Sequence, residues 1–165
     1  PVIAAVNGIC CGGGLELALS ADIILAADHA SFALPEIRSG TVADAASIKL
    51  PKRIPYHIAM EMLLTGRWIE AEEAARWGLI NRIVPADGLM DAAWEMARLI
   101  ASGPPLVYAA IKEIVRDAED SKFQDVMNRI TKRQLATVDI LYSSEDQLEG
   151  AKAFAEKRDP VWKGR

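Results

Sequence analysis

The fold is decided by the first eighteen residues of the chain, which read PVIAAVNGICCGGGLELA (residues 1–18). The continuous apolar run at residues 2–6 is typical of a β-strand that is buried on both faces. Three glycines at residues 12–14 then precede a segment that predicts a helix from Leu15 onward. This stretch therefore predicts a strand, a glycine turn and a helix in succession.

The segments that follow continue the alternation of helices and strands. Strands are predicted at residues 21–27, 31–34 and 79–84, and helices at residues 56–65, 71–77 and 89–101. Gly66 and Gly78 end the first two of these helices, as glycine commonly does. Alternation of this kind predicts an α/β core.

The best internal boundary is the sequence SGPP at residues 102–105, because glycine and proline interrupt regular structure. The core is therefore assigned to residues 1–103, and residues 104–165 are expected to be helical. Three helices are predicted there, and none is long enough to bury a core alone, so we expect them to pack on a partner subunit. Ser144 and Gln147 predict a capping box for the last of them, which ends near Lys157.

Composition and charge exclude several classes of protein. The net charge of −4 provides no basic surface for nucleic acid. No apolar run approaches the roughly 18 residues that a membrane span needs. Cys10 and Cys11 are adjacent and would form a strained bridge, which favours free thiols and a cytoplasmic enzyme. His29 and His57 are the only histidines, so no metal site is expected.

The chain opens directly on its apolar run, at Pro1. A strand that is buried on both faces needs neighbours on each side. The sequence therefore predicts that a further segment precedes residue 1 in a longer protein.

The glycine triplet has two interpretations. It lacks the patterns GxGxxG and GxxxxGK[ST], which disfavours nucleotide binding. It could be only a tight turn, or its backbone N–H groups could bind an oxygen that gains negative charge during a reaction. Glu16 could simply complement the helix dipole, and Glu36 could be a loop carboxylate. Together, however, the two could form an acid/base pair.

Several segments carry a resemblance to a known family. Residues 1–8, the run GGGLELA at 12–18 and the run LPE at 34–36 resemble the signature region of the enoyl-CoA hydratase/isomerase, or crotonase, family. The stretches at residues 62–67 and 154–158 are similar to later parts of the same family. The resemblance implies a crotonase-like (ClpP/crotonase) spiral α/β core with its front missing. It also implies that residues 104–165 form a helical trimerisation region.

The resemblance also implies roles for five residues. Glu16 and Glu36 match the two glutamates that hold and activate the catalytic water, and the backbone N–H of Gly13 matches one half of the oxyanion hole. The other half, with part of the coenzyme A site, is implied to lie upstream of residue 1. Phe154 and Lys157 match positions that contact the adenine and phosphate end of coenzyme A, although Lys157 could be a plain solvated lysine.

The implied reaction is hydration or dehydration of an α,β-unsaturated acyl-CoA by a homotrimer or hexamer. Coenzyme A is part of the substrate, and no cofactor is expected. Residues 32–36 and 154–165 are similar to family members that act on crotonobetainyl-CoA. The alternatives are a general short-chain enoyl-CoA hydratase, an enoyl-CoA isomerase, an acyl-CoA hydrolase and a non-catalytic subunit on the same scaffold. The presence of both glutamates favours hydration.

One segment departs from the family pattern. After Gly40 many relatives carry a proline and a glycine pair, whereas residues 41–47 read TVADAAS. Fewer glycines stiffen a loop that borders the acyl pocket, and Asp44 in this loop is a candidate to face a cationic acyl group. Aromatic side chains could also bind such a cation, with core packing as the alternative. The candidates are Trp68, Trp77, Trp94 and Tyr56.

Overall fold

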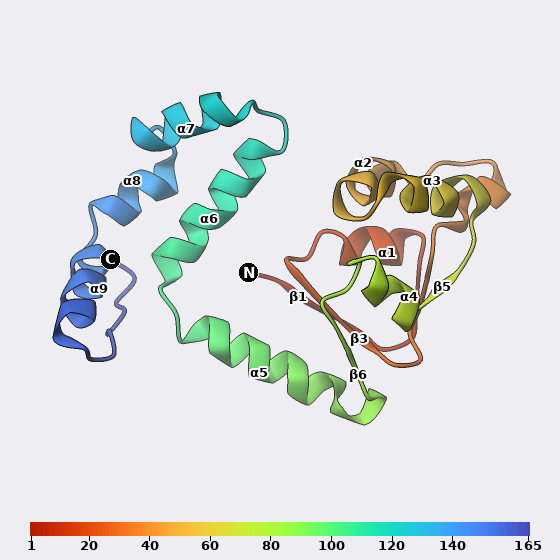
Figure 1. The fold of residues 1–165 in the computed structure, drawn as a ribbon, viewed down its shortest axis with the longest axis horizontal. Coiled ribbons are helices and arrows are strands. Elements are labelled where there is room, and N and C mark those ends of the chain that lie inside the picture. Colours follow the sequence, from red (N-terminus) through yellow and green to blue (C-terminus); the bar gives the residue numbers. More distant parts are fainter. The chain divides into compact units, whose positions relative to one another are not determined.

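The computed structural model describes residues 1–165 as two compact units, residues 1–97 and 98–165 (Figure 1). Unit 1 contains all the strands, and unit 2 contains helices only. The helix α5 (Leu89–Ala101) runs from the first unit into the second. The predicted functional division after residue 103 stays a prediction, because a division by packing does not say what each part binds.

The first sheet of unit 1 is parallel and has the strand order β1-β3-β6 (Ile3–Val6, Ile23–Ala27 and Arg82–Val84). The strand β1 lies at the edge of this sheet, and all four of its residues are half-buried. Burial of β1 on both faces is therefore not complete within the described chain, and it stays a prediction for a longer protein. On its open side, β1 and α1 (Gly13–Ala18) line an apolar groove of about 550 Å³.

The second sheet contains β2 (Ile9–Cys11), β4 (Ser31–Ala33) and β5 (Ile69–Glu70). The first two pair in parallel, with Cys10 opposite Phe32, and β5 pairs with β4 in the antiparallel sense. The sequence predicted neither β2 nor β5. Each has only two or three residues, and each is a strand because β4 supplies hydrogen-bonding partners.

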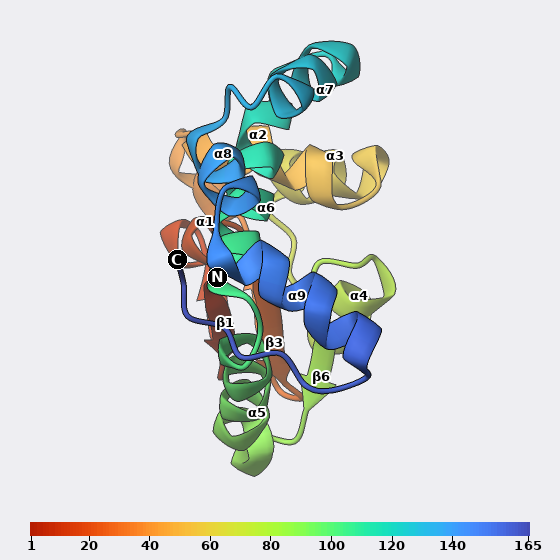
Figure 2. The same ribbon diagram turned by 90° about the vertical axis from the view of Figure 1, so that its left-hand side faces the viewer.

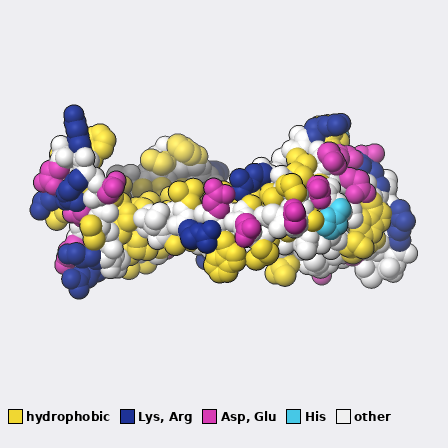
Figure 3. Space-filling view, turned by 90° about the horizontal axis from the view of Figure 1, so that it is seen from below, with side chains coloured by type: hydrophobic (Ala, Val, Ile, Leu, Met, Phe, Trp, Pro, Cys, Tyr) yellow, Lys and Arg dark blue, Asp and Glu magenta, His cyan; other side chains and the backbone are white.

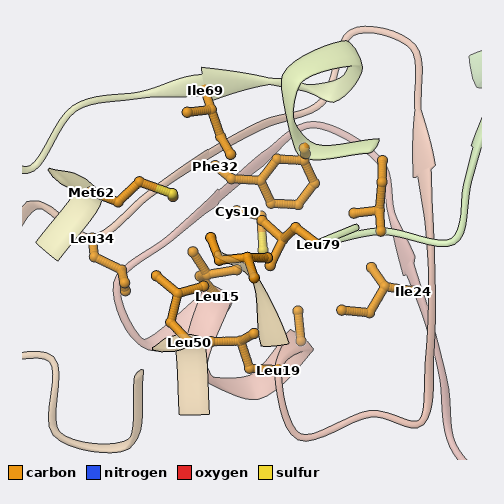
Figure 4. Packing of buried hydrophobic residues seen from close by; sticks show 14 of the residues in the cluster. Cys10, Leu15, Leu19, Ile24, Phe32, Leu34, Leu50, Met62, Ile69 and Leu79 are labelled. Carbon is orange, nitrogen blue, oxygen red and sulfur yellow. The ribbon is translucent and has the colours of Figure 1, made fainter. Parts of the chain in front are cut away.

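The main core lies between the two sheets and the helices α1, α2 (Asp44–Arg53), α3 (Tyr56–Thr65) and α4 (Ala71–Arg76). Figure 4 shows Phe32, Leu15 and Leu50 packed together, and all three are fully buried. Burying a side chain of this size stabilises the fold by about 1.5–3 kcal/mol. Cys10 is part of this core, and burial raises the pKa of its thiol to about 11.

The segment around Asp44 is a helix, not the predicted loop. The α2 helix begins at Asp44, and its residues Ala46 and Leu50 are fully buried. This spacing of four residues places both side chains on one face of the helix, against the core. The prediction failed because alanine, present at residues 45 and 46, is a good helix former.

Two further predictions for unit 1 need correction. The predicted strand at residues 79–84 is limited to β6, because Leu79 donates its N–H to the Ala74 carbonyl (2.9 Å) and so closes the end of α4. Glu36, which could have been a loop carboxylate, belongs to a regular element instead. It lies in a short 3-10 helix, η1 (Pro35–Ser39).

Unit 2 contains four helices instead of the predicted three: α6 (Pro105–Ala118), α7 (Phe123–Thr131), α8 (Ala136–Tyr142) and α9 (Glu145–Glu156). The predicted serine cap of α9 is confirmed, since the Ser144 hydroxyl accepts the Gln147 N–H (3.2 Å). The α8 helix was missed because its cap is distant in sequence.

The distant cap of α8 is the carboxylate of Glu113 on α6. It accepts the N–H groups of Ala136 (3.2 Å) and Thr137 (2.8 Å) at the start of the helix. The core of unit 2 is small. Many large apolar side chains of unit 2 are exposed, and Figure 3 shows hydrophobic side chains on the surface of the molecule. They include Ile111, Val115, Phe123, Ile140, Leu148 and Phe154. No helix of the structure is both long and apolar enough to cross a membrane.

Candidate active site

The glycine turn that precedes α1 has a backbone that only glycine adopts readily. Gly12 has φ +54° and ψ −129°, and its N–H donates to the Ala33 carbonyl (3.0 Å). The helix begins at Gly13, so the N–H groups of its first turn lack intrahelical acceptors. Gly13 is exposed, and no other atom lies within 4 Å of the point where a Cβ would stand. A ligand oxygen can therefore approach this backbone closely.

The carboxylate of Glu36 lies against this turn. A Cβ on Gly12 would stand 2.8 Å from Glu36 Oε1, so the two residues are in close contact. The other oxygen, Oε2, is buried and has no hydrogen-bond partner in the chain. Buried carboxylate oxygens nearly always accept a hydrogen bond. Glu36 Oε2 is thus free to accept a hydrogen bond or a proton from a ligand.

The carboxylate of Glu16 is held by the neighbouring helix. Its Oε1 accepts the N–H of Ala46 (3.0 Å) in the first turn of α2, where the helix dipole favours a negative charge. Glu16 itself lies in the first turn of α1, directly after the glycine turn. This contact fixes the orientation of the carboxylate, and neither the spacing nor the composition of the sequence indicated it.

Strand pairing explains why residues distant in sequence meet here. β2 and β4 are parallel neighbours, with Cys11 opposite Ala33. The carboxyl ends of parallel strands lie at the same edge of a sheet. Gly12 follows one strand directly, and Glu36 follows the other after two residues. The structure therefore brings the glycine turn and both glutamates together in unit 1.

Gly66, which follows the last residue of α3, packs against the short helix that carries Glu36. It adopts the left-handed conformation (φ +62°), and a Cβ there would stand 3.2 Å from both Ile37 Cγ2 and Pro35 Cα. The end of α3 therefore packs closely on η1. Gly66 was read from the sequence only as a helix stop, and Gly12 only as part of a turn. In both cases the missed feature is a close contact that only a glycine allows.

Phe154 and Lys157 lie in unit 2, at the end of α9. The Phe154 ring is 89% exposed. Lys157 caps the helix in the left-handed conformation (φ 55°, ψ 41°) and is exposed. No ion pair or hydrogen bond of its ammonium group is formed within the chain. The solvated-lysine interpretation therefore stays open beside the coenzyme A interpretation.

The candidates for binding a cationic acyl group are distributed unevenly. Asp44 is exposed, two residues before the Ala46 amide that holds Glu16. Trp77 is half-buried and donates its indole N–H to Glu73 (3.1 Å). The other three aromatic candidates are exposed instead of packed in the core: Trp68, Trp94 and Tyr56. No group of three or more His, Cys, Asp or Glu side chains is arranged to hold a metal ion.

The fold and the site together define a class of α/β protein. In this class a glycine turn after a parallel strand starts a helix, and two carboxylates flank the turn. The family described as enoyl-CoA hydratase/isomerase matches residues 1–165, and the chain belongs to this family.

Individual relatives agree with this assignment. The chain is 51% identical to carnitinyl-CoA dehydratases of Citrobacter koseri and Salmonella arizonae, over 100% and 99% of its own length. It spans 64% and 63% of the length of these two relatives.

Solved structures share the fold over the whole chain. An enoyl-CoA hydratase structure from Geobacillus kaustophilus superposes with a TM-score of 0.91 at 41% identity, and 63% of that chain is covered. An enoyl-CoA hydratase from Mycobacterium tuberculosis gives a TM-score of 0.90 at 40% identity, with 64% covered. The predicted crotonase-like α/β fold is confirmed.

Proposed function

We propose that this chain is part of a hydro-lyase that adds water to, or removes it from, an α,β-unsaturated acyl-CoA thioester. The observation that carries the proposal is the buried, unpartnered Oε2 of Glu36 beside an open helix N-terminus. Such an arrangement suits a reaction in which an oxygen gains charge while a carboxylate exchanges a proton. The membership of the chain in the enoyl-CoA hydratase/isomerase family supports the same reaction.

The proposed mechanism uses Gly13, Glu16 and Glu36. The thioester oxygen accepts the Gly13 N–H, which stabilises the enolate that forms as water adds; losing one such donor typically costs about 10²–10³ in rate. One glutamate takes a proton from water as the water oxygen bonds to Cβ. The other glutamate delivers a proton to Cα. The second oxyanion donor is proposed to lie upstream of residue 1.

The proposed substrate is crotonobetainyl-CoA, because relatives at 51% identity are carnitinyl-CoA dehydratases. A general short-chain enoyl-CoA hydratase is the second candidate, since the similar solved structures are named enoyl-CoA hydratases. We expect the full-length protein to hydrate crotonobetainyl-CoA with a higher kcat/KM than crotonyl-CoA. A preference for crotonyl-CoA would contradict the substrate but keep the reaction. No turnover of either would favour an isomerase, a hydrolase or a non-catalytic subunit.

Asp44 is the proposed counter-charge for the trimethylammonium group, because it lies in the same helical turn as the amide that holds Glu16. Asp44→Ala is expected to lower the kcat/KM ratio of crotonobetainyl-CoA to crotonyl-CoA roughly tenfold, the effect of losing one partly solvated charge contact. The matched control is Asp87→Ala, which removes another exposed carboxylate of unit 1. An unchanged ratio in the Asp44 variant would remove Asp44 from the acyl site.

Phe154 and Lys157 are proposed to contact the adenine and phosphate end of coenzyme A. An exposed aromatic ring and an unpaired ammonium group suit a stacked base and a phosphate, respectively. A homotrimer or hexamer is proposed because unit 2 exposes many large apolar side chains. A cytoplasmic location is proposed because Cys10 and Cys11 are both free thiols.

A further inference from the structure

The last helix of the chain carries a buried carboxylate that the proposed reaction does not use. Asp146, in the first turn of α9, is only 2% exposed. Its two oxygens accept the N–H groups of Lys163 and Gly164, each at 2.8 Å. Its own N–H donates to the Arg165 carbonyl (3.1 Å). Burying a carboxylate is unfavourable unless hydrogen bonds compensate, so these contacts hold the end of the chain on α9.

A second anchor lies one turn further along α9. Glu149 accepts two hydrogen bonds from the Arg158 guanidinium (2.6 and 3.0 Å) and one from the Val161 N–H (2.9 Å). Arg158 also donates to Glu156 (2.6 Å). A carboxylate that binds a guanidinium through both oxygens is held in a defined geometry. The Arg158 hydrogen bonds lower the pKa of Glu149 to about 2, so the carboxylate stays charged over the usual pH range.

Together the two anchors fold the C-terminal tail, residues 158–165, back along α9. Figures 1 and 2 show this tail running beside the helix from its end towards its start. The Trp162 ring packs on Gly150, where a Cβ would stand 3.2 Å from the indole. Every contact of the tail described here is made within unit 2.

Lys157, the residue directly before the tail, has an unusual backbone conformation. The N–H of Arg158 donates to the Ala153 carbonyl (3.1 Å), and the N–H of Lys157 donates to the Phe154 carbonyl (3.3 Å). These are the two bonds of a Schellman motif, in which glycine normally occupies the left-handed position. Here the position is held by Lys157, one of two non-glycine residues with positive φ. An L-residue is unfavourable there, so a compensating role for its side chain is the natural explanation.

The same turn presents Phe154 and Lys157 together. Phe154 lies in the last turn of α9, and Lys157 directly follows the last helical residue, Glu156. The ring and the ammonium group therefore project from the same end of α9, directly before the point where Arg158 is anchored. If the tail were released, the residue that follows Lys157 would lose its fixed position.

We propose that Asp146 and Glu149 are positioning residues: by anchoring the C-terminal tail on α9, they fix the turn that presents Phe154 and Lys157 to the nucleotide end of the acyl-CoA. The inference rests on the proposed coenzyme A contact of these two residues. It extends that proposal to residues that touch no substrate.

The test compares two thioesters on the full-length enzyme: crotonyl-CoA and crotonyl-pantetheine, which lacks the entire 3′-phosphoadenosine diphosphate end. Glu149→Gln is expected to raise KM for crotonyl-CoA about tenfold, with kcat and the KM for crotonyl-pantetheine unchanged. The matched control is Glu113→Gln, which removes a carboxylate that makes several hydrogen bonds in unit 2 but lies on α6. The control should leave the ratio of the two KM values unchanged. Equal effects of Glu149→Gln on both thioesters, or a fall in kcat, would overturn the inference.

A second variant separates the role of the side chain from that of the fold. Lys157→Gly keeps the Schellman turn and suits it better, so the melting temperature is expected to stay the same or rise. The KM for crotonyl-CoA should nevertheless rise about tenfold, as the ammonium group is lost. An unchanged KM would overturn both the coenzyme A contact and the positioning role.

Binding measurements cover the case of an enzyme that turns over neither crotonobetainyl-CoA nor crotonyl-CoA. The dissociation constant of coenzyme A, measured by calorimetry, then replaces KM. A roughly tenfold weakening in Glu149→Gln with no change in Glu113→Gln would support the positioning role, while the proposed reaction itself would fail. Unchanged binding in Glu149→Gln would overturn the positioning role.

Discussion

Replacing Glu36 with glutamine is expected to lower kcat for hydration in the full-length enzyme by about 10²–10⁴-fold, the usual contribution of a general acid or base. Glutamine has nearly the same shape, so the contact with the glycine turn is preserved. It cannot, however, exchange a proton with water or with Cα. The measurement is the loss of enoyl-thioester absorbance as the double bond is hydrated.

The same variant should not lose stability. Glu36 Oε2 makes no hydrogen bond in the chain, so removing the charge breaks no contact there. A neutral amide is also less costly to bury than a carboxylate. The matched control is Glu70→Gln, which changes an exposed glutamate on β5 of the second sheet. A Glu36→Gln enzyme with kcat within a factor of about three of the parent would remove Glu36 from the reaction, since it lies far below the usual general-acid/base effect.

Replacing Gly12 with alanine is expected to damage both activity and stability. The new Cβ would stand 2.8 Å from Glu36 Oε1, and the backbone at φ +54° and ψ −129° is strained for alanine. Such strain costs about 1–3 kcal/mol. Displacing a catalytic group by about 1 Å can lower the rate by about 10²-fold. The measurements are the free energy of unfolding and kcat.

Gly78→Ala separates the strain from the contact. Gly78 also has positive φ (+76°), but no other atom lies within 4 Å of the Cβ position. This variant should lose stability, by about 1–2 kcal/mol, and keep its activity. Adding Glu36→Asp to Gly12→Ala shortens the crowded side chain, so stability should recover in part while activity stays low. If Gly12→Ala lost stability but kept its activity, as expected for Gly78→Ala, the close contact with Glu36 would not be the reason why residue 12 is a glycine.

Local signals predicted some elements well. The α6 helix lies in the region predicted to be helical, residues 104–165, and it begins at Pro105, because proline at the first helical position is a signal within the segment itself. The cap of α9 by Ser144 was likewise predicted, since capping needs only residues three apart. Elements that depend on distant partners were missed. The strand β2 needs β4, and the start of α8 needs Glu113, which is 24 residues from Thr137.

The sequence by itself determined the family, the α/β class of the core and the identity of the candidate groups Gly13, Glu16 and Glu36, because motifs and their spacing are properties of the chain alone. Only the tertiary structure decided how these groups are held. The Ala46 amide that orients Glu16 lies 30 residues away in sequence, on a helix that was predicted to be a loop. Glu36 meets Gly12 because two parallel strands end at the same edge of a sheet, and strand pairing is set by packing between segments, which no single segment encodes.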